Sequence, residues 1–363
     1  MAMPSPPRQE TMAPHERMGA IMMGQKPDRV PFSPFIFGFC AKNVGLPVST
    51  VYEDAEKSFF AQLRTAEMYG YDGAPLYGYA SYGGWEFGGD IKMPRSRWEQ
   101  APVVAHYPVE SEEDVDRLEL PDVERAGSLP ISMTFSRLQE KFGMPITVQL
   151  VGVVTLVGEL CSVDRMCRWM IKRPELVHKL MRKAVDHLVD VAKLWVDTFP
   201  VERMQPFVGD ATSANQVISP KQFEEFALPY QKEVHEKVLD MGVMSMFNHI
   251  CGEQNLNLPF WRQIPHGRDG VPGILSFGHE VDLTTAIEMF GEDNIIAGNV
   301  EPRLIQNGTP EEVFAACVAC LEKGKQAPNY RYMLMAGCEV PVEAPPYNLF
   351  TMRKAVMEHG FYD

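Results

Sequence analysis

Short apolar runs of strand-like composition recur along the chain, separated by longer stretches in which apolar side chains return every three or four residues. Strands that alternate with helices are typical of a parallel sheet. Eight such units predict an α/β fold of the (β/α)8 TIM-barrel type, and a doubly wound open sheet is the alternative. The chain contains neither the GxGxxG nor the Walker-type loop that would favour the open sheet. The predicted strands are residues 29–37, 71–78, 145–152, 203–210, 243–251, 273–280, 295–300 and 332–338.

Local capping signals place the starts of three predicted helices. Thr50, Ser219 and Thr309 are each followed three residues later by Glu or Gln, which is the spacing of a capping box. A proline stands directly after Ser219 and Thr309, at the first helical position, where a helix tolerates it best. The predicted helices run from residue 50 to near 70, from 174 to 196, from 219 onward, from 309 to near 324 and from about 347 onward.

We expect residues 1–363 to form a single domain. Residues 80–125, after the second predicted strand, are irregular and rich in Gly, Pro and aromatic residues, and they predict an insertion with a small hairpin. The segment 77–89, which begins just before this insertion and continues into it, is rich in aromatic residues and glycine. It either covers the barrel mouth as a lid or packs as the core of a loop. Residues 1–15 predict a loose N-terminal arm without the basic-then-apolar order of a signal peptide.

Composition and charge narrow the classes of function. The chain is 45% hydrophobic and 23% charged, as expected of a globular protein with a large core. Its net charge of −14 argues against nucleic-acid binding, and no apolar run is long enough to span a membrane. We therefore expect a cytoplasmic protein whose partners are neither nucleic acids nor membranes, and a homodimer stays open. The 22 methionines suit either an adaptable core or a broad apolar pocket.

One strand end carries candidate metal chemistry. The seven cysteines do not form a disulfide framework, so we expect reduced thiols. His249 and Cys251 are two residues apart at the end of the fifth predicted strand and therefore share one face. Cys338 ends the eighth strand, and the carboxyl ends of barrel strands are where active sites form. One imidazole and two thiolates predict a zinc site with an open fourth position; the alternative is a buried cysteine beside a hydrogen-bonded histidine.

Other polar residues at strand ends extend the candidate site. Asp210 ends the fourth strand and is a candidate catalytic residue, as a fourth zinc ligand, as a partner that orients His249, or as a base; a helix cap is the alternative. Asn299 and His279 end the seventh and sixth strands and are candidates for cofactor binding. A satisfied structural polar residue is the alternative for His279.

Two further groups compete with this set. Glu339 and Glu343 follow Cys338 and are alternative ligands. Cys317 and Cys320 form a CxxC, but they fall on the apolar face of the helix predicted from residue 309. We therefore interpret these two cysteines as part of the core.

These residues together resemble the uroporphyrinogen decarboxylase superfamily, whose members are (β/α)8 barrels. The resemblance covers most of the chain, in segments 29–35, 209–230 and 298–313. Within that superfamily the chain is similar to the corrinoid-dependent zinc methyltransferases, which include the methylcobalamin:coenzyme M methyltransferases. Their mark is a His-x-Cys pair and a distant Cys on zinc, and His249, Cys251 and Cys338 match it. The "RQAGR" type of motif with which the decarboxylases grip carboxylates is absent.

The resemblance implies a zinc-dependent enzyme that moves a methyl group between a small methyl donor or thiol acceptor and the cobalt of a corrinoid. The chain has no Asp-x-His-x-x-Gly segment of the corrinoid-binding type, so the corrinoid is expected on a partner protein. The alternatives are a metal-free lyase of the decarboxylase type and a catalytically silent member that only binds a ligand or a corrinoid protein. The identity of the methyl donor or acceptor and the direction of transfer stay open.

Overall fold

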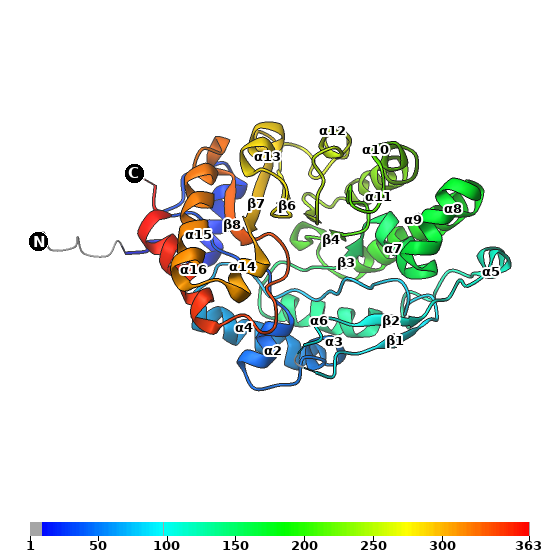
Figure 1. Cartoon of the computed structure of the whole chain (residues 1–363). Coiled ribbons are helices and arrows are strands. Elements are labelled where there is room, and N and C mark those ends of the chain that lie inside the picture. The colour runs from blue at the N-terminus through cyan, green and yellow to red at the C-terminus, as the bar shows by residue number, and fades with distance from the viewer. Residues whose placement is uncertain (1–8, 97, 363) are drawn as a thin grey trace, which may run out of the picture.

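The centre of the molecule is a parallel sheet. The computed structural model describes residues 9–96 and 98–362 (Figure 1). Six of its strands lie side by side in chain order, from β3 to β8, and every neighbouring pair is parallel. Parallel neighbours need a crossover connection, and helices on the outside of the sheet provide it. The strands are β3 (Gln149–Val151), β4 (Phe207–Asp210), β5 (Phe247–Ile250), β6 (Gly273–Phe277), β7 (Asn294–Val300) and β8 (Tyr332–Ala336).

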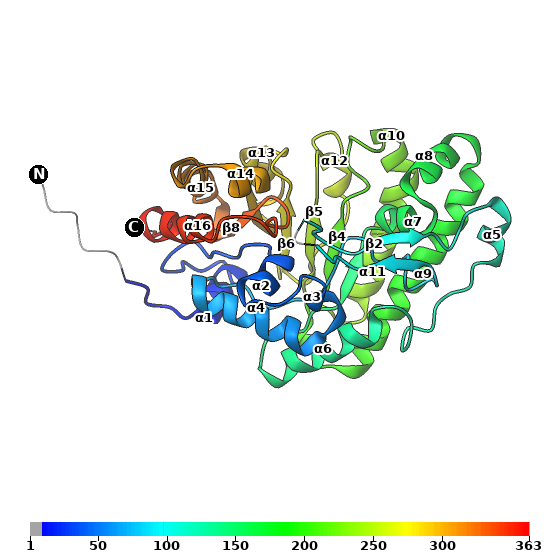
Figure 2. The same cartoon turned by 60° about the horizontal axis from the view of Figure 1, so that its bottom comes forward.

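Two extended segments complete the (β/α)8 barrel that the sequence predicts. Residues 30–36 lie beside β8, because Phe32 forms a parallel bridge with Leu334. Residues 72–79 follow next, since the Asp72 amide donates a 2.6 Å hydrogen bond to the Phe32 carbonyl oxygen. The helices on either side of this seam also touch, with the rings of Tyr69 in α4 and Phe350 in α16 4.5 Å apart (Figures 1 and 2).

The prediction of regular strands at residues 29–37 and 71–78 is wrong in detail. Both segments are extended, but neither forms a hydrogen-bonded ladder in the part of the chain that is described. Pro31, Pro34 and Pro75 explain the difference, because a proline has no backbone N–H to donate to a neighbouring strand. The barrel is therefore least regular where its first two units stand.

Helices surround the barrel, and their starts test the capping predictions. Ser219 and Thr309 are caps as predicted, each accepting a hydrogen bond from the backbone amide three residues on. The box predicted at Thr50 is wrong: the long helix begins after Asp54, whose carboxylate caps it, and ends at the left-handed Gly70. The helices are α1 (Pro14–Met22), α2 (Gly38–Asn43), α3 (Thr50–Glu53), α4 (Ala55–Tyr69), α5 (Glu112–Arg117), α6 (Leu129–Lys141), α7 (Val153–Cys161), α8 (Val163–Lys172), α9 (Pro174–Thr198), α10 (Pro220–Gln222), α11 (Leu228–Asp240), α12 (Leu258–Trp261), α13 (Leu283–Phe290), α14 (Pro302–Asn307), α15 (Pro310–Gly324) and α16 (Pro346–His359). None of the helices described is both long and apolar enough to traverse a lipid bilayer.

The insertion contains the predicted hairpin, formed by β1 (Asp90–Lys92) and β2 (Val103–His106). The segment just before it folds around the buried carboxylate of Glu86. That carboxylate accepts hydrogen bonds from the Tyr79 hydroxyl at 2.7 Å, the Gly83 amide at 2.8 Å and the Ser128 hydroxyl at 2.8 Å. The aromatic segment is therefore packed as a loop core.

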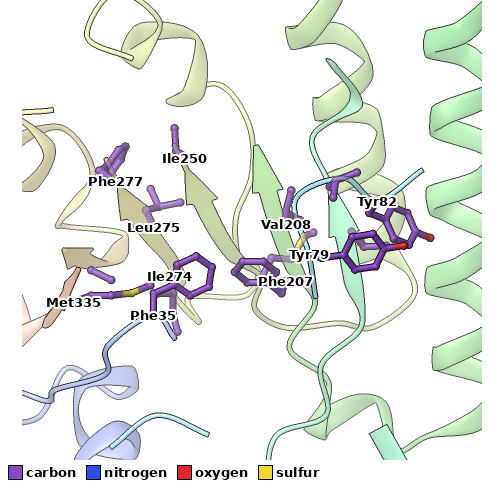
Figure 3. Close-up of a cluster of buried hydrophobic side chains, with 14 of the residues drawn as sticks. Phe35, Tyr79, Tyr82, Phe207, Val208, Ile250, Ile274, Leu275, Phe277 and Met335 are labelled. Atoms are coloured by element: carbon purple, nitrogen blue, oxygen red, sulfur yellow. The ribbon is translucent and has the colours of Figure 1, made fainter. Parts of the chain in front are cut away.

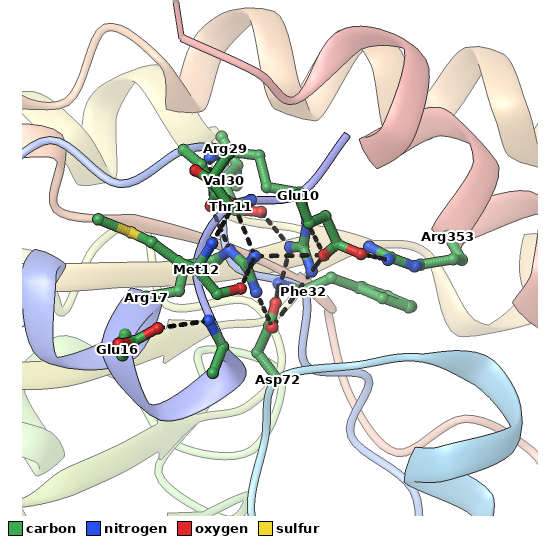
Figure 4. A network of polar contacts seen from close by, with 12 residues as sticks. Glu10, Thr11, Met12, Glu16, Arg17, Arg29, Val30, Phe32, Asp72 and Arg353 are labelled. Carbon is green, nitrogen blue, oxygen red and sulfur yellow. Dashed lines mark hydrogen bonds and ion pairs between the residues drawn. The ribbon is translucent and has the colours of Figure 1, made fainter. Parts of the chain in front are cut away.

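A cluster of charged side chains joins the N-terminal segment to the starts of the first two barrel segments and to α16 (Figure 4). Asp72 lies at its centre and accepts hydrogen bonds from the guanidinium groups of Arg17 and Arg29, and all three side chains are buried. Each charge in the cluster meets an opposite charge, which offsets the cost of removing it from water. We call the cluster the basal network; it consists of Glu10, Arg17, Asp28, Arg29, Asp72 and Arg353.

The basal network includes part of the N-terminal arm that the sequence predicts to be loose. Residues 1–8 of the predicted arm lie outside the described residues. The rest is held in place: the Thr11 and Met12 amides donate to Asp28 at 2.8 and 3.0 Å, and Glu10 pairs with Arg29 and Arg353. The expectation of a loose arm is therefore wrong for residues 9–15.

Candidate metal centre

Buried aromatic and aliphatic side chains pack along both faces of the strands that carry the candidate site (Figure 3). Phe35 from the first segment and Phe207 from β4 face one another, with ring centroids 5.7 Å apart. The Phe35 ring also lies 4.9 Å from the imidazole of His249. The imidazole of His249 therefore packs against buried aromatic side chains.

The strands bring the three predicted ligands together at this end of the barrel. His249 lies within β5, Cys251 directly follows that strand, and Cys338 lies just beyond β8. The ligand atoms of the three residues are all within 4.8 Å of one another. The two sulfurs are 3.5 Å apart, far beyond a disulfide bond of about 2.0 Å and near the roughly 3.8 Å expected for two sulfurs on one tetrahedral zinc ion. The donor set and its spacing fit a zinc ion.

The imidazole of His249 is held on one side and unpaired on the other. Its Nδ1 lies 3.0 Å from the Ser276 hydroxyl. Its Nε2 is buried and has no hydrogen-bond partner among the residues described. Burying such a nitrogen without a partner is costly, so an unpaired Nε2 beside two thiols is a further feature that suits a metal ligand.

The two thiols differ in their affinity for protons. The hydrogen bond from the Cys251 thiol holds the pKa of Cys338 well below its usual range, and His249 acts in the same direction. The same contact, together with burial, raises the pKa of Cys251. The contact thus favours a thiolate at Cys338 over one at Cys251, and a metal held by both sulfurs would displace the proton between them. The chain turns away at Gly252, whose φ of +73° suits a glycine.

Asp210 lies at the end of β4, but its carboxylate is engaged within the fold. It accepts hydrogen bonds from the Thr155 hydroxyl at 2.9 Å and the Ser213 hydroxyl at 2.8 Å. Burial raises the pKa of Asp210 above its ordinary value. The space is tight, because a Cβ at Gly152 would lie 2.3 Å from the Asp210 Cγ. Its predicted catalytic role stays a prediction.

The two residues predicted to bind a cofactor lie in different surroundings. His279 is about one-third exposed, with Nδ1 3.3 Å from Glu280 and Nε2 3.9 Å from Glu301. Asn299 donates both amide hydrogens to backbone carbonyls of the loop 278–281, at 3.0 and 2.7 Å. The expectation that Asn299 donates to a ligand therefore conflicts with its contacts, whereas the side chain of His279 is partly exposed.

The residues considered as alternative metal ligands are engaged in contacts within the fold. Glu339 accepts a hydrogen bond from the Gly38 amide at 3.2 Å, and burial raises its pKa to about 8. Glu343 pairs with Lys42. In the CxxC, Cys317 is fully buried in the core, in line with the interpretation of that motif as structural.

Sequence reasoning missed two neighbours of His249, namely Ser276 and Phe35. Ser276 interrupts the apolar run of β6, and a polar residue inside such a run was the available signal. Phe35 gave no signal, because phenylalanine is common in strands and cores.

Comparisons with known proteins give relatives that are named for two different activities. It is 27% identical over 280 residues to the methylcobamide:CoM methyltransferase MtbA of Methanosarcina mazei, covering 75% of this chain and 74% of that protein. It is 25% identical over 241 residues to the methylated-thiol–coenzyme M methyltransferase of the same organism, covering 65% of this chain and 60% of that protein. It is also 26% identical over 195 residues to the uroporphyrinogen decarboxylase of a Synechococcus species, covering 52% and 50%.

The fold is shared with a solved structure. A methyltransferase from Methanosarcina mazei superposes with a TM-score of 0.79 at 20% identity, covering 96% of this chain and 99% of that one. The family model described as uroporphyrinogen decarboxylase (URO-D) matches residues 13–359. The chain therefore belongs to the uroporphyrinogen decarboxylase (URO-D) family.

Proposed function

We propose that this protein is a zinc-dependent methyltransferase that moves a methyl group between a small methyl donor or thiol acceptor and the cobalt of a corrinoid carried on a partner protein. The convergence of His249, Cys251 and Cys338, with their ligand atoms within 4.8 Å of one another, carries the proposal. The relatives named methylcobamide:CoM and methylated-thiol–coenzyme M methyltransferase support the reaction class. Free thiols and an unpaired imidazole nitrogen support a metal in preference to a disulfide.

The residues of the chain suggest how the site works. The Nε2 atom of His249 and the sulfurs of Cys251 and Cys338 would hold the ion and leave a fourth position for substrate. Zinc, when bound, lowers the pKa of a thiol in that position or polarises a methyl donor, and the corrinoid supplies the cobalt chemistry. Phe35 packs against the imidazole and keeps water from that side of the site, which strengthens electrostatic interactions there.

A metal-free lyase of the decarboxylase type is the second candidate, because uroporphyrinogen decarboxylases are among the relatives. The two candidates differ in their need for a metal. Removal of zinc with a chelator abolishes methyl transfer in the first case and leaves activity intact in the second.

The test is an absorbance assay of the corrinoid. Purified protein loaded with zinc is mixed with methylcobalamin and a panel of thiols, including coenzyme M, and separately with cob(I)alamin and methylated thiols or ethers. We expect a protein-dependent change of corrinoid spectrum with one substrate pair, lost in Cys251→Ala and kept in Cys167→Ala, whose thiol lies on α8. Decarboxylation of a porphyrinogen by metal-free protein, or equal methyl transfer by Cys251→Ala, contradicts the proposal.

A further inference from the structure

The geometry points to Ser276 as a positioning residue of the metal centre. Its hydroxyl lies 3.0 Å from Nδ1 of His249. By accepting the Nδ1 hydrogen it would direct Nε2 of the same ring toward Cys251 and Cys338. The inference rests on the proposed function in one respect, namely that a metal binds at His249. It adds to that function a fourth residue that touches neither metal nor substrate and that sets the affinity of the site.

The pairing of β5 with β6 creates the contact. His249 and Ser276 are partners in the register of these two parallel strands, so their side chains project on the same face at the same height. The distance between His249 Nδ1 and Ser276 Oγ is 3.0 Å. Both residues are buried, and each strand has a further hydrogen-bonded neighbour, β4 or β7. A contact between two interior strands is more rigid than one supplied by a loop.

Gly209 and Phe35, two further neighbours of the ring, offer it no side-chain hydrogen bond. On the β4 side the register partner of His249 is Gly209, which has no side chain. Phe35 contacts the imidazole with its ring, 4.9 Å between centroids and tilted by 43°. When a metal occupies Nε2, Nδ1 must carry the hydrogen, and Ser276 Oγ is placed to accept it.

The burial of Ser276 also supports a positioning role for its hydroxyl. Its relative exposure is 0%, and its neighbours along β6 are Ile274, Leu275 and Phe277. A hydroxyl in such an apolar strand costs free energy unless it has a partner. The contact of its Oγ with His249 provides that partner, so the imidazole accounts for a serine at this position.

The experiment compares the zinc affinity of four proteins by competition with a chromophoric chelator. We expect Ser276→Ala to bind zinc roughly 10- to 100-fold more weakly than the wild type, the range found when such supporting partners are removed. Ser276→Thr keeps the hydroxyl and is expected to restore most of the affinity. The matched control is Ser245→Ala, because Ser245 is also buried and donates a 2.8 Å hydrogen bond to the Pro272 carbonyl before these strands begin; its affinity should equal the wild type.

A spectrum separates positioning from general destabilisation. With Co²⁺ in place of zinc, the visible bands report the ligand geometry, and we expect them to change in Ser276→Ala and to stay unchanged in Ser245→Ala. Equal affinity and equal spectra in these two variants overturn the inference while the proposed function stands. Failure of the wild type to bind either metal overturns the proposed function and the inference together. Should Ser276→Ala not fold in thermal unfolding, Ser276→Gly, which also lacks the hydroxyl, is measured in its place.

Discussion

Replacement of Cys338 by alanine tests the proposed centre most directly. A four-ligand structural zinc site binds with an apparent free energy of about 10–16 kcal/mol, so one ligand of four contributes roughly 2.5–4 kcal/mol, or two to three powers of ten in affinity. In this chain the sulfur of Cys338 lies 3.5 Å from that of Cys251 and within 4.8 Å of the His249 ligand atom. Its loss leaves two donors, so we expect a dissociation constant for zinc 100- to 1000-fold higher.

The assay is chelator competition, with zinc content measured by atomic spectrometry after dialysis. Cys167→Ala is the matched control, because Cys167 is also a partly buried free cysteine, on α8, with its sulfur 3.9 Å from the Val217 carbonyl oxygen. Thermal unfolding of both variants checks that the fold persists. Equal zinc content and affinity in Cys338→Ala and Cys167→Ala refute the reasoning.

Three further predictions concern the scaffold. Asp72→Asn removes the anion that pairs with two buried guanidinium groups, and in a denaturant titration it should lower the free energy of unfolding by about 3–5 kcal/mol. The control is Asp197→Asn, which breaks an exposed ion pair and should lower the free energy of unfolding by less than about 0.5 kcal/mol. Burial lowers the pKa of His187 to about 3, so the unfolded chain takes up a proton below pH 6.5 that the folded chain does not. Stability should therefore fall with pH from 6.5 downward by up to about 1.4 kcal/mol per unit from this residue, and unfolding curves of His187→Asn should show a shallower dependence. Gly152→Ala places a Cβ 2.3 Å from the Asp210 Cγ and should cost about 1–3 kcal/mol; an unchanged melting temperature contradicts that packing.

Features that depend on short stretches of sequence were predictable. Capping boxes at Ser219 and Thr309 involve residues three apart, and both formed. The shared face of His249 and Cys251 follows from the two-residue period of a strand. The convergence with Cys338 needed one more step, the eight-unit barrel, which places the carboxyl ends of all strands at one mouth.

Features that depend on contacts between distant segments were not predictable. The amide of Asn299 is occupied by the carbonyls of a loop some 20 residues earlier, and the partner of Ser276 is known only once the register of two strands is known. The first two barrel segments have the composition of strands, yet their prolines remove the donors that a ladder needs. The contacts that hold residues 9–15 include the ion pair of Glu10 with Arg353, which lies 343 residues away in the chain.

The seam between the first and last barrel units has a consequence for biosynthesis. A chain emerges from the ribosome with its N-terminus first. Residues 30–36 can pair with residues 72–79 early, but their second neighbour is β8, which they contact through Phe32 and Leu334. Until β8 is made, the nascent chain has two exposed sheet edges, one at residues 30–36 and one at the strand made last. Unpaired backbone groups at a sheet edge can pair with other chains and so promote aggregation. Translation that stalls before residue 332 should therefore yield insoluble or chaperone-bound material, whereas completion of β8 lets the ring close on itself.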